Sequence, residues 1–289
     1  MAKTAFVGLG VMGFPMAGHL SAKGHEVTVH NRTFAKAEAW VARHGGAAAR
    51  SPREAAEGAQ LVFVCVGNDD DVRAVVLGPE GALASMVRGA ILVDHTTTSA
   101  RLARELHEEA GRGGIGFLDA PVSGGQAGAQ SGQLTVMCGG EAAPFEAARP
   151  VIDAYAKACT LIGPAGAGQL TKMMNQICIA GIVQGLAEAI DFGARAGLDL
   201  PAAIGAISKG AAQSWQLENR WRSMVDGQFE FGFAVDWMRK DLGFCLEEAR
   251  RLGAQLPLTA LVDQLYQRVQ ARGGNRWDTS SLIQLLQQP

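Results

Sequence analysis

The most constraining feature of this sequence is a glycine-rich turn directly after its first strand-like segment. Thr4–Val7 is a short, mostly apolar run, and Met12–Lys23 has the apolar spacing of a helix. The sequence between them matches G-x-G-x-x-G, which allows a tight turn, a close approach of the backbone to a pyrophosphate, and close packing of the helix. The first N–H groups of the helix then face the phosphates. We therefore predict a dinucleotide site formed by Gly8, Leu9, Gly10, Val11, Met12 and Gly13.

The first half of the chain continues this alternation of strand-like and helical segments, which is typical of a parallel α/β sheet. The predicted strands are Thr4–Val7, Glu26–His30, Leu61–Val66, Ile91–Asp94, Gly116–Asp119, Leu134–Cys138 and Thr160–Ile162. The predicted helices between them include Met12–Lys23, Ala35–His44, Arg101–Arg112 and Pro144–Tyr155.

The second half of the chain has no strand signal. Gln169–Arg195 is rich in alanine, with a small or apolar residue at most turns, and this pattern predicts one long, largely buried helix. Val235–Leu252 and Leu258–Val269 also have helical periodicity. With the boundary in the turn Gly163–Gly166, we predict an α/β Rossmann domain with a parallel sheet over residues 1–163, joined by the long helix to an all-α C-terminal domain over residues 164–289.

Composition limits the partners of this chain. Lys and Arg total 26 against 28 Asp and Glu, and this balance has no basic excess for nucleic acid or an anionic membrane. We find no apolar run near the roughly 20 residues of a membrane span, and no signal-peptide pattern at the start. The five cysteines suit a reducing cytosol, so we expect a cytoplasmic protein. Neither the cysteines nor the histidines have metal-site spacing, so we expect no metal.

The residues after the second predicted strand indicate which dinucleotide binds. NAD-binding domains usually carry an Asp or Glu there, which hydrogen-bonds the ribose hydroxyls. Here the strand ends in His30 and continues as Asn31-Arg32-Thr33. Asn31 lacks the carboxylate that would repel a 2′-phosphate, while Arg32 offers a planar guanidinium and Thr33 a hydroxyl to bind it. We therefore predict NADP(H) as the cofactor.

Four separated blocks of the sequence resemble the β-hydroxyacid dehydrogenase family, which includes 3-hydroxyisobutyrate dehydrogenases, tartronate semialdehyde reductases and glyoxylate/succinic semialdehyde reductases. The blocks are Gly8–Leu20 (GLGVMGFPMAGHL), Asp119–Gly132 (DAPVSGGQAGAQSG), Gly166–Gln176 (GAGQLTKMMNQ) and Lys240–Gly243 (KDLG). They follow the family's order over the whole chain. The resemblance implies a Rossmann domain, a long helix, and a helical domain that builds the subunit interface of a homodimer or homotetramer.

The resemblance implies that Lys172 is the catalytic residue and that Ser123, Gly124 and Gly125 bind the substrate. Consecutive small residues expose N–H groups that can hold a carboxylate, and a serine hydroxyl can bond the reacting oxygen. A lysine ammonium can donate the proton to the oxygen that becomes a hydroxyl and stabilise its developing charge. In the oxidation direction the same amine must be neutral, and an ordinary lysine has a pKa of about 10.4. We therefore expect reduction to dominate near neutral pH and oxidation to improve in alkali.

Asn175 is expected to hold the substrate or to orient Lys172, because it lies three residues later and is a neighbour on a helix. Some relatives use the residue four positions after the lysine, here Gln176, and we favour Asn175. The resemblance also implies cofactor contacts from Val66, Gly67, Thr97 and Lys240. Phe231 is a minor candidate for the wall of the substrate pocket.

These residues predict NADPH-dependent reduction of a small aldehyde acid, such as succinic semialdehyde, glyoxylate or tartronate semialdehyde, with Lys172 as general acid/base. One alternative is an NAD(P)-dependent dehydrogenase of 3-hydroxyisobutyrate or another 3-hydroxyacid. Arg32 and its neighbours argue against it, because those enzymes typically use NAD. A second alternative is a cofactor-binding scaffold without turnover. Members of the superfamily that act as scaffolds have lost the lysine, so Lys172 argues against a scaffold. Enzymes with related folds that reduce imines generally lack it too, so Lys172 also argues against imine reduction.

Overall fold

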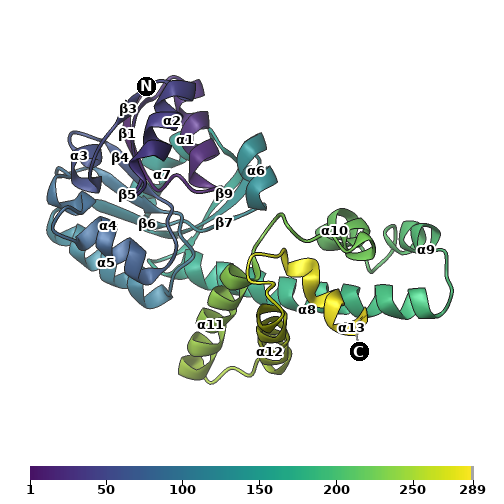
Figure 1. Ribbon diagram of the computed structural model, residues 1–289. Coiled ribbons are helices and arrows are strands. Elements are labelled where there is room, and N and C mark those ends of the chain that lie inside the picture. The colour runs from purple at the N-terminus through teal and green to yellow at the C-terminus, as the bar shows by residue number, and fades with distance from the viewer. Residues whose placement is uncertain (288–289) are drawn as a thin grey trace. The chain divides into compact units, whose positions relative to one another are not determined.

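The computed structural model describes residues 1–287 of the chain (Figure 1). The chain divides into two compact units, Met1–Lys172 and Met173–Pro289. The division lies within the long helix α8 (Ala167–Arg195), whereas the sequence places the domain boundary in the turn before that helix.

The first unit is built on a nine-stranded sheet in the order β3-β2-β1-β4-β5-β6-β8-β7, with β9 beside β8. Its strands are β1 (Lys3–Val7), β2 (Glu26–His30), β3 (Ala47–Ala48), β4 (Leu61–Val64), β5 (Ile91–Asp94), β6 (Gly116–Asp119), β7 (Val122–Ser123), β8 (Leu134–Gly140) and β9 (Ala156–Gly163). Its helices are α1 (Gly13–Ala22), α2 (Phe34–His44), α3 (Pro52–Ala56), α4 (Asp69–Leu77), the short 3-10 helix η1 (Ala82–Ala84), α5 (Ala100–Arg112), α6 (Gly125–Ser131) and α7 (Ala142–Ile152).

The predicted parallel sheet is confirmed for β1 to β6, whose neighbouring strands all pair in parallel. Beyond β6 the sheet is mixed, because β8 runs antiparallel to both β6 and β7 and parallel to β9. The sequence does not reveal this reversal, since a continuous apolar run looks the same in either strand direction. The two-residue strands β3 and β7 are also absent from the sequence prediction, because two residues are too few to show a pattern.

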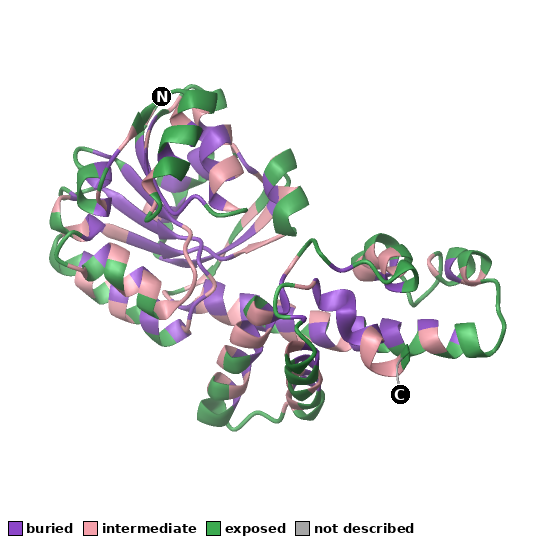
Figure 2. Cartoon of the chain, viewed as in Figure 1, coloured by how far each residue is buried: buried purple, intermediate pink, exposed green. Residues whose placement is uncertain are grey.

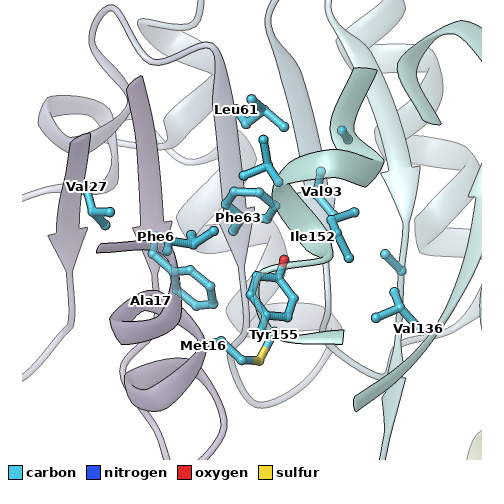
Figure 3. Close-up of a cluster of buried hydrophobic side chains, with 14 of the residues drawn as sticks. Phe6, Met16, Ala17, Val27, Leu61, Phe63, Val93, Val136, Ile152 and Tyr155 are labelled. Carbon is cyan, nitrogen blue, oxygen red and sulfur yellow. The ribbon is translucent and has the colours of Figure 1, made fainter. Parts of the chain in front are cut away.

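Alternate residues of the central strands serve two separate cores, one on each face of the sheet. Phe6 and Phe63 belong to the core that contains residues of α1, α2 and α7 (Figure 3). Ala5 and Val7, the neighbours of Phe6, belong instead to the core with residues of α3, α4 and α5. Burial of one large apolar side chain contributes about 1.5–3 kcal/mol, so both faces hold the strands of this sheet in register.

The second unit is helical, as predicted. Its elements after α8 are α9 (Leu200–Ile207), α10 (Trp215–Asp226), α11 (Val235–Leu252), α12 (Pro257–Ala271), the 3-10 helix η2 (Thr279–Ile283) and α13 (Gln284–Gln287). Its core joins residues of α8, α11 and α12, including Val183, Leu242 and Tyr266. Buried Asp278 closes the C-terminal part, because its carboxylate accepts hydrogen bonds from Nε of Arg220 at 3.0 Å and from the backbone N–H of Phe233 at 2.9 Å.

Helix α8 departs from two expectations. It is not largely buried, because exposed segments recur along its length (Figure 2). Met174, Ile182 and Phe192 are 67%, 40% and 71% exposed. The expectation that no segment reaches the length and apolar composition of a membrane span was also wrong. Within residues 1–287, α8 meets both criteria, with 39% of its most apolar window buried. This is a weak indication of a membrane, since core helices of soluble proteins meet the same criteria.

Candidate active site

The glycine-rich turn combines two positions that require glycine for packing with one that leaves space. A side chain on Gly8, which has a φ of 99°, would collide with the carbonyl oxygen of Cys65, and one on Gly13 would collide with the carbonyl oxygen of Gly8. A side chain on Gly10 would meet nothing within 4 Å. No side chain caps the start of α1, so its first N–H groups can serve phosphate oxygens. These residues therefore fit a dinucleotide pyrophosphate.

Asn31 joins the end of β2 to this turn. Its Oδ1 accepts a hydrogen bond from the backbone N–H of Leu9 at 2.9 Å, and its Nδ2 donates to the carbonyl oxygen of Thr33 at 3.0 Å. The side chain of Arg32 is 93% exposed, with Nη1 3.7 Å from Oδ1 of Asp71 in α4. Arg32 is thus available at the surface beside the turn, together with a carboxylate that the sequence did not connect to it.

The residues after β4 and β5 lie at the same edge of the sheet, because the carboxyl ends of parallel strands meet there. The backbone N–H of Val66 donates to Oγ1 of Thr96 at 3.0 Å and so links the two loops. Thr97 is half-buried, whereas Thr96 and Thr98 on either side of it are buried. The structure therefore brings Val66, Thr97 and the glycine-rich turn to one edge, with half-buried Gly67 next to Val66.

The predicted substrate-binding segment lies at the junction of β7 and α6. Ser123 is half-buried, while Gly124 and Gly125 are exposed and have φ values of 126° and 60°. These left-handed backbone conformations favour glycine. Two exposed residues without side chains therefore follow Ser123.

Lys172 is 7% exposed and lies near the start of α8. That start is anchored by buried Asp119 at the end of β6, which accepts hydrogen bonds from the backbone N–H groups of Gly166 at 2.7 Å and Gln169 at 2.9 Å. Burial raises the pKa of Asp119 to about 6, and these hydrogen bonds oppose the rise by favouring the carboxylate. The buried lysine is therefore carried by a helix turn tied to the sheet.

In the second unit, the amide of Gln176 is already engaged. It is 2% exposed, accepts a hydrogen bond from Nδ2 of Asn175 at 2.8 Å and donates one to Oδ2 of Asp241 at 2.7 Å. Asn175 is half-buried and lies one turn after Lys172 on α8. Gln176 is therefore an anchor between α8 and α11.

Lys240 and Phe231, the other candidates in the second unit, each lie beside aromatic or cationic groups. Nζ of Lys240 is 3.2 Å from Oδ1 of Asp241 and 5.3 Å from the centre of the Phe244 ring. Phe231 is 41% exposed, and the guanidinium carbon of Arg220 lies 5.1 Å from its ring centre.

His95 lies behind the Thr96–Thr98 loop and has the contacts of a structural residue. Its Nδ1 faces the carbonyl oxygen of Ala120 at 2.6 Å and therefore carries the proton, so its Nε2 accepts the hydrogen bond from the Tyr155 hydroxyl at 2.8 Å. Burial lowers the pKa of His95 to about 4, so the ring is neutral at neutral pH.

Among residues 1–287, no group of three or more His, Cys, Asp or Glu side chains is placed to hold a metal ion.

One residue of this region, Gln169, was not predicted from the sequence. Its side chain is fully buried and forms hydrogen bonds with the backbone of Thr96 and Thr98, on either side of Thr97. Its sequence signal is only its position in the block Gly166–Gln176, three residues before Lys172. The bonds themselves join segments far apart in the chain and have no local pattern.

A Rossmann sheet with this turn at its carboxyl edge defines a protein that binds a nicotinamide dinucleotide. Two family models match nearly the whole chain: the NAD binding domain of 6-phosphogluconate dehydrogenase over residues 3–163, and the NAD-binding domain of NADP-dependent 3-hydroxyisobutyrate dehydrogenase over residues 166–286. The chain therefore belongs to the β-hydroxyacid dehydrogenase family. It is an oxidoreductase that acts on hydroxyl groups with NAD or NADP.

Individual relatives agree with this family. The 2-hydroxy-3-oxopropionate reductase of Escherichia coli is 34% identical over 289 residues, 99% of this chain and 97% of that protein. The NAD-dependent L-serine dehydrogenase of Pseudomonas aeruginosa is 34% identical over 292 residues, 99% and 98% of the two chains. The structure of Mycobacterium tuberculosis 3-hydroxyisobutyrate dehydrogenase with L-serine is 31% identical, with a TM-score of 0.90 over 100% of both chains.

The geometry of the turn predicts different effects for two similar substitutions. Gly13→Ala should lower the free energy of unfolding by about 1–3 kcal/mol, because its methyl group meets the Gly8 carbonyl oxygen. Gly10→Ala should leave stability within about 0.5 kcal/mol of wild type but weaken cofactor binding at least tenfold, because its methyl group occupies the space for the pyrophosphate. Denaturant unfolding and NADPH fluorescence titration measure the two effects. Normal cofactor affinity of Gly10→Ala would contradict this assignment of the turn.

Proposed function

We propose that the protein uses NADPH to reduce a small aldehyde acid, such as succinic semialdehyde, glyoxylate or tartronate semialdehyde, to the hydroxy acid. The observation that carries the proposal is buried Lys172, 7% exposed, on a helix whose first turn is bonded to the loop at the carboxyl edge of the Rossmann sheet. Similarity to the 2-hydroxy-3-oxopropionate reductase of Escherichia coli supports this substrate class.

In this proposal the bound cofactor supplies the hydride, and the residues of the chain orient the substrate and move the proton. The ammonium of Lys172 donates a proton to the carbonyl oxygen as it becomes a hydroxyl. Before the proton moves, the positive charge of the ammonium stabilises the negative charge that develops on that oxygen. Burial strengthens this interaction, because water screens the two charges less. Ser123 and the N–H groups of Gly124 and Gly125 hold the substrate, and Asn175 orients the lysine.

For the cofactor, Arg32 supports NADPH because its exposed guanidinium can pair with a 2′-phosphate. Asp71 is a competing partner for Arg32. Exposed ion pairs contribute only about 0–1 kcal/mol, so a phosphate with greater charge can displace it at little cost. Because Asn31 is neutral and bonded to the turn, it adds no repulsion to the phosphate.

We also propose that a second copy of the chain covers the exposed face of α8. That face is a stripe of small and apolar residues at helical spacing: Met174, Cys178, Ile182, Gly185, Ala189 and Phe192. The stripe supports a protein partner over a lipid surface, because polar residues such as Gln176 and Gln184 occupy the other faces of α8 within this unit. The proposal agrees with the expected homodimer or homotetramer.

Lys172→Ala should retain NADPH binding and lose turnover by a factor of about 10² or more, because the proton donor is removed. Turnover is followed as NADPH consumption over a panel of aldehyde acids, and NADPH binding by fluorescence titration. Lys157→Ala, which changes an exposed lysine of β9, should behave as wild type. If the wild-type protein consumes NADPH with no member of the panel, the proposal fails and the scaffold alternative is favoured. Near-normal turnover of Lys172→Ala would remove the lysine from the mechanism.

Arg32→Ala should lower kcat/KM for NADPH about tenfold or more, because a hydrogen bond between charged groups contributes about 1.5–3 kcal/mol. The value for NADH should stay unchanged. Asp71→Asn is the matched variant: removal of the competing carboxylate should improve NADPH use by up to about fivefold. The comparison requires kcat/KM for both cofactors in all three proteins. Equal use of NADPH and NADH by the wild type would overturn the preference for NADPH.

Ile182→Glu should shift the protein toward monomer, because the substitution places a charge in the centre of the apolar stripe. Sedimentation velocity over a range of protein concentrations measures this shift. Glu247→Gln, at an exposed position of α11, serves as the control. A wild-type protein that sediments as a monomer at all concentrations, or one that binds lipid vesicles through this face, would contradict the proposed second copy.

A further inference from the structure

The side chain of Gln169 links two segments of the first unit that the proposed reaction needs at a defined spacing. Its Oε1 accepts a hydrogen bond from the backbone N–H of Thr98 at 3.0 Å, and its Nε2 donates one to the carbonyl oxygen of Thr96 at 2.8 Å. Its own backbone N–H donates to Oδ2 of Asp119 at 2.9 Å. Gln169 is fully buried, so water does not substitute for these partners.

The backbone around Gln169 is packed too closely to move independently of the sheet. A side chain on Gly168 would collide with the carbonyl oxygen of Met137 in β8 and meet the carbonyl oxygen of Asp119 at 2.6 Å. A side chain on Gly139 would meet the backbone nitrogens of both Ala167 and Gly168 at 2.8 Å. The first turn of α8 therefore packs directly on β6 and β8. From this turn the side chain of Gln169 extends toward the neighbouring loop after β5.

The chemistry of glutamine matches this position. The loop presents one carbonyl oxygen and one N–H group, and a side-chain amide offers one donor and one acceptor on a common plane. An apolar side chain would leave both buried backbone groups without a partner, and a carboxylate could not donate to Thr96. The pair of bonds holds the backbone on both sides of Thr97, while Thr96 also accepts from the N–H of Val66.

Lys172 follows Gln169 by three residues on the same helix, so its position is set by the turn that Gln169 fixes. We propose that Gln169 is a positioning residue of the reaction, which holds the loop of Thr97 and the ammonium of Lys172 at the separation that proton donation requires. The inference rests on the proposed role of Lys172 as general acid. Small displacements of a reacting group reduce turnover strongly, so the effect of Gln169 appears in kcat.

A double-mutant cycle tests this inference with the full-length protein. Gln169→Met removes both hydrogen bonds of the side-chain amide, keeps nearly the same side-chain length, and should lower kcat at least tenfold. In the Lys172→Ala background the same substitution should lower kcat less than twofold, because the group it positions is already absent. A merely structural role would instead lower the active fraction equally in both backgrounds. The assays use a temperature at which circular dichroism shows all four proteins folded.

Two further variants complete the experiment. Gln184→Met changes a buried glutamine of the same helix, 7% exposed, and should keep wild-type kcat. If Gln169→Met does not fold, Gln169→Glu replaces it in the cycle, because a glutamate keeps the acceptor for Thr98. A kcat within twofold of wild type, or an equal loss in both backgrounds, would overturn the inference while Lys172→Ala still confirms the general acid. Near-normal turnover of Lys172→Ala would overturn both.

Discussion

The hydrogen bonds to the carboxylate of Asp119 are the interaction on which the proposed site depends. Asp119 is fully buried at the end of β6, and its oxygens accept the N–H groups of Gly166 and Gln169 in the first turn of α8. A buried carboxylate without such donors would be costly, and N–H groups at a helix start would otherwise lack partners. Each group therefore satisfies the other. Since burial raises the pKa of Asp119 only to about 6, the carboxylate is mostly ionised at neutral pH. Its negative charge then stabilises the N-terminal end of α8.

Glycine makes this arrangement possible and also leaves room for ligands. Gly8, Gly13 and Gly168 allow backbone segments to approach so closely that a methyl group would not fit. Gly10 and Gly125 have open space where a side chain would stand. The first group brings the helices onto the sheet edge, and the second exposes N–H groups there. A chain with a net charge of −2 can thus bind anions through local backbone groups and a few basic side chains.

Most elements can be predicted from the sequence because their signals are local. The bounds of β2, β5, β6 and α11 agree with the predicted segments, since each is an apolar or periodic run with clear ends. Patterns failed where the information is not local. The direction of β8 depends on its neighbours, β7 has two residues, and the exposure of α8 depends on what packs against it. A helix of small apolar residues reads the same whether it faces a core or a partner.

The sequence by itself determined the class of fold, the glycine-rich turn and the family, because spacing and residue type carry those signals along the chain. Only the tertiary structure decided which distant groups meet. It placed the amide of Asn31 on the turn, the carboxylate of Asp71 beside Arg32, and the side chain of Gln169, on the helix of Lys172, against the loop after β5. Such contacts join segments far apart in the chain, and packing of the sheet and helices, rather than any local preference, brings them within hydrogen-bonding distance.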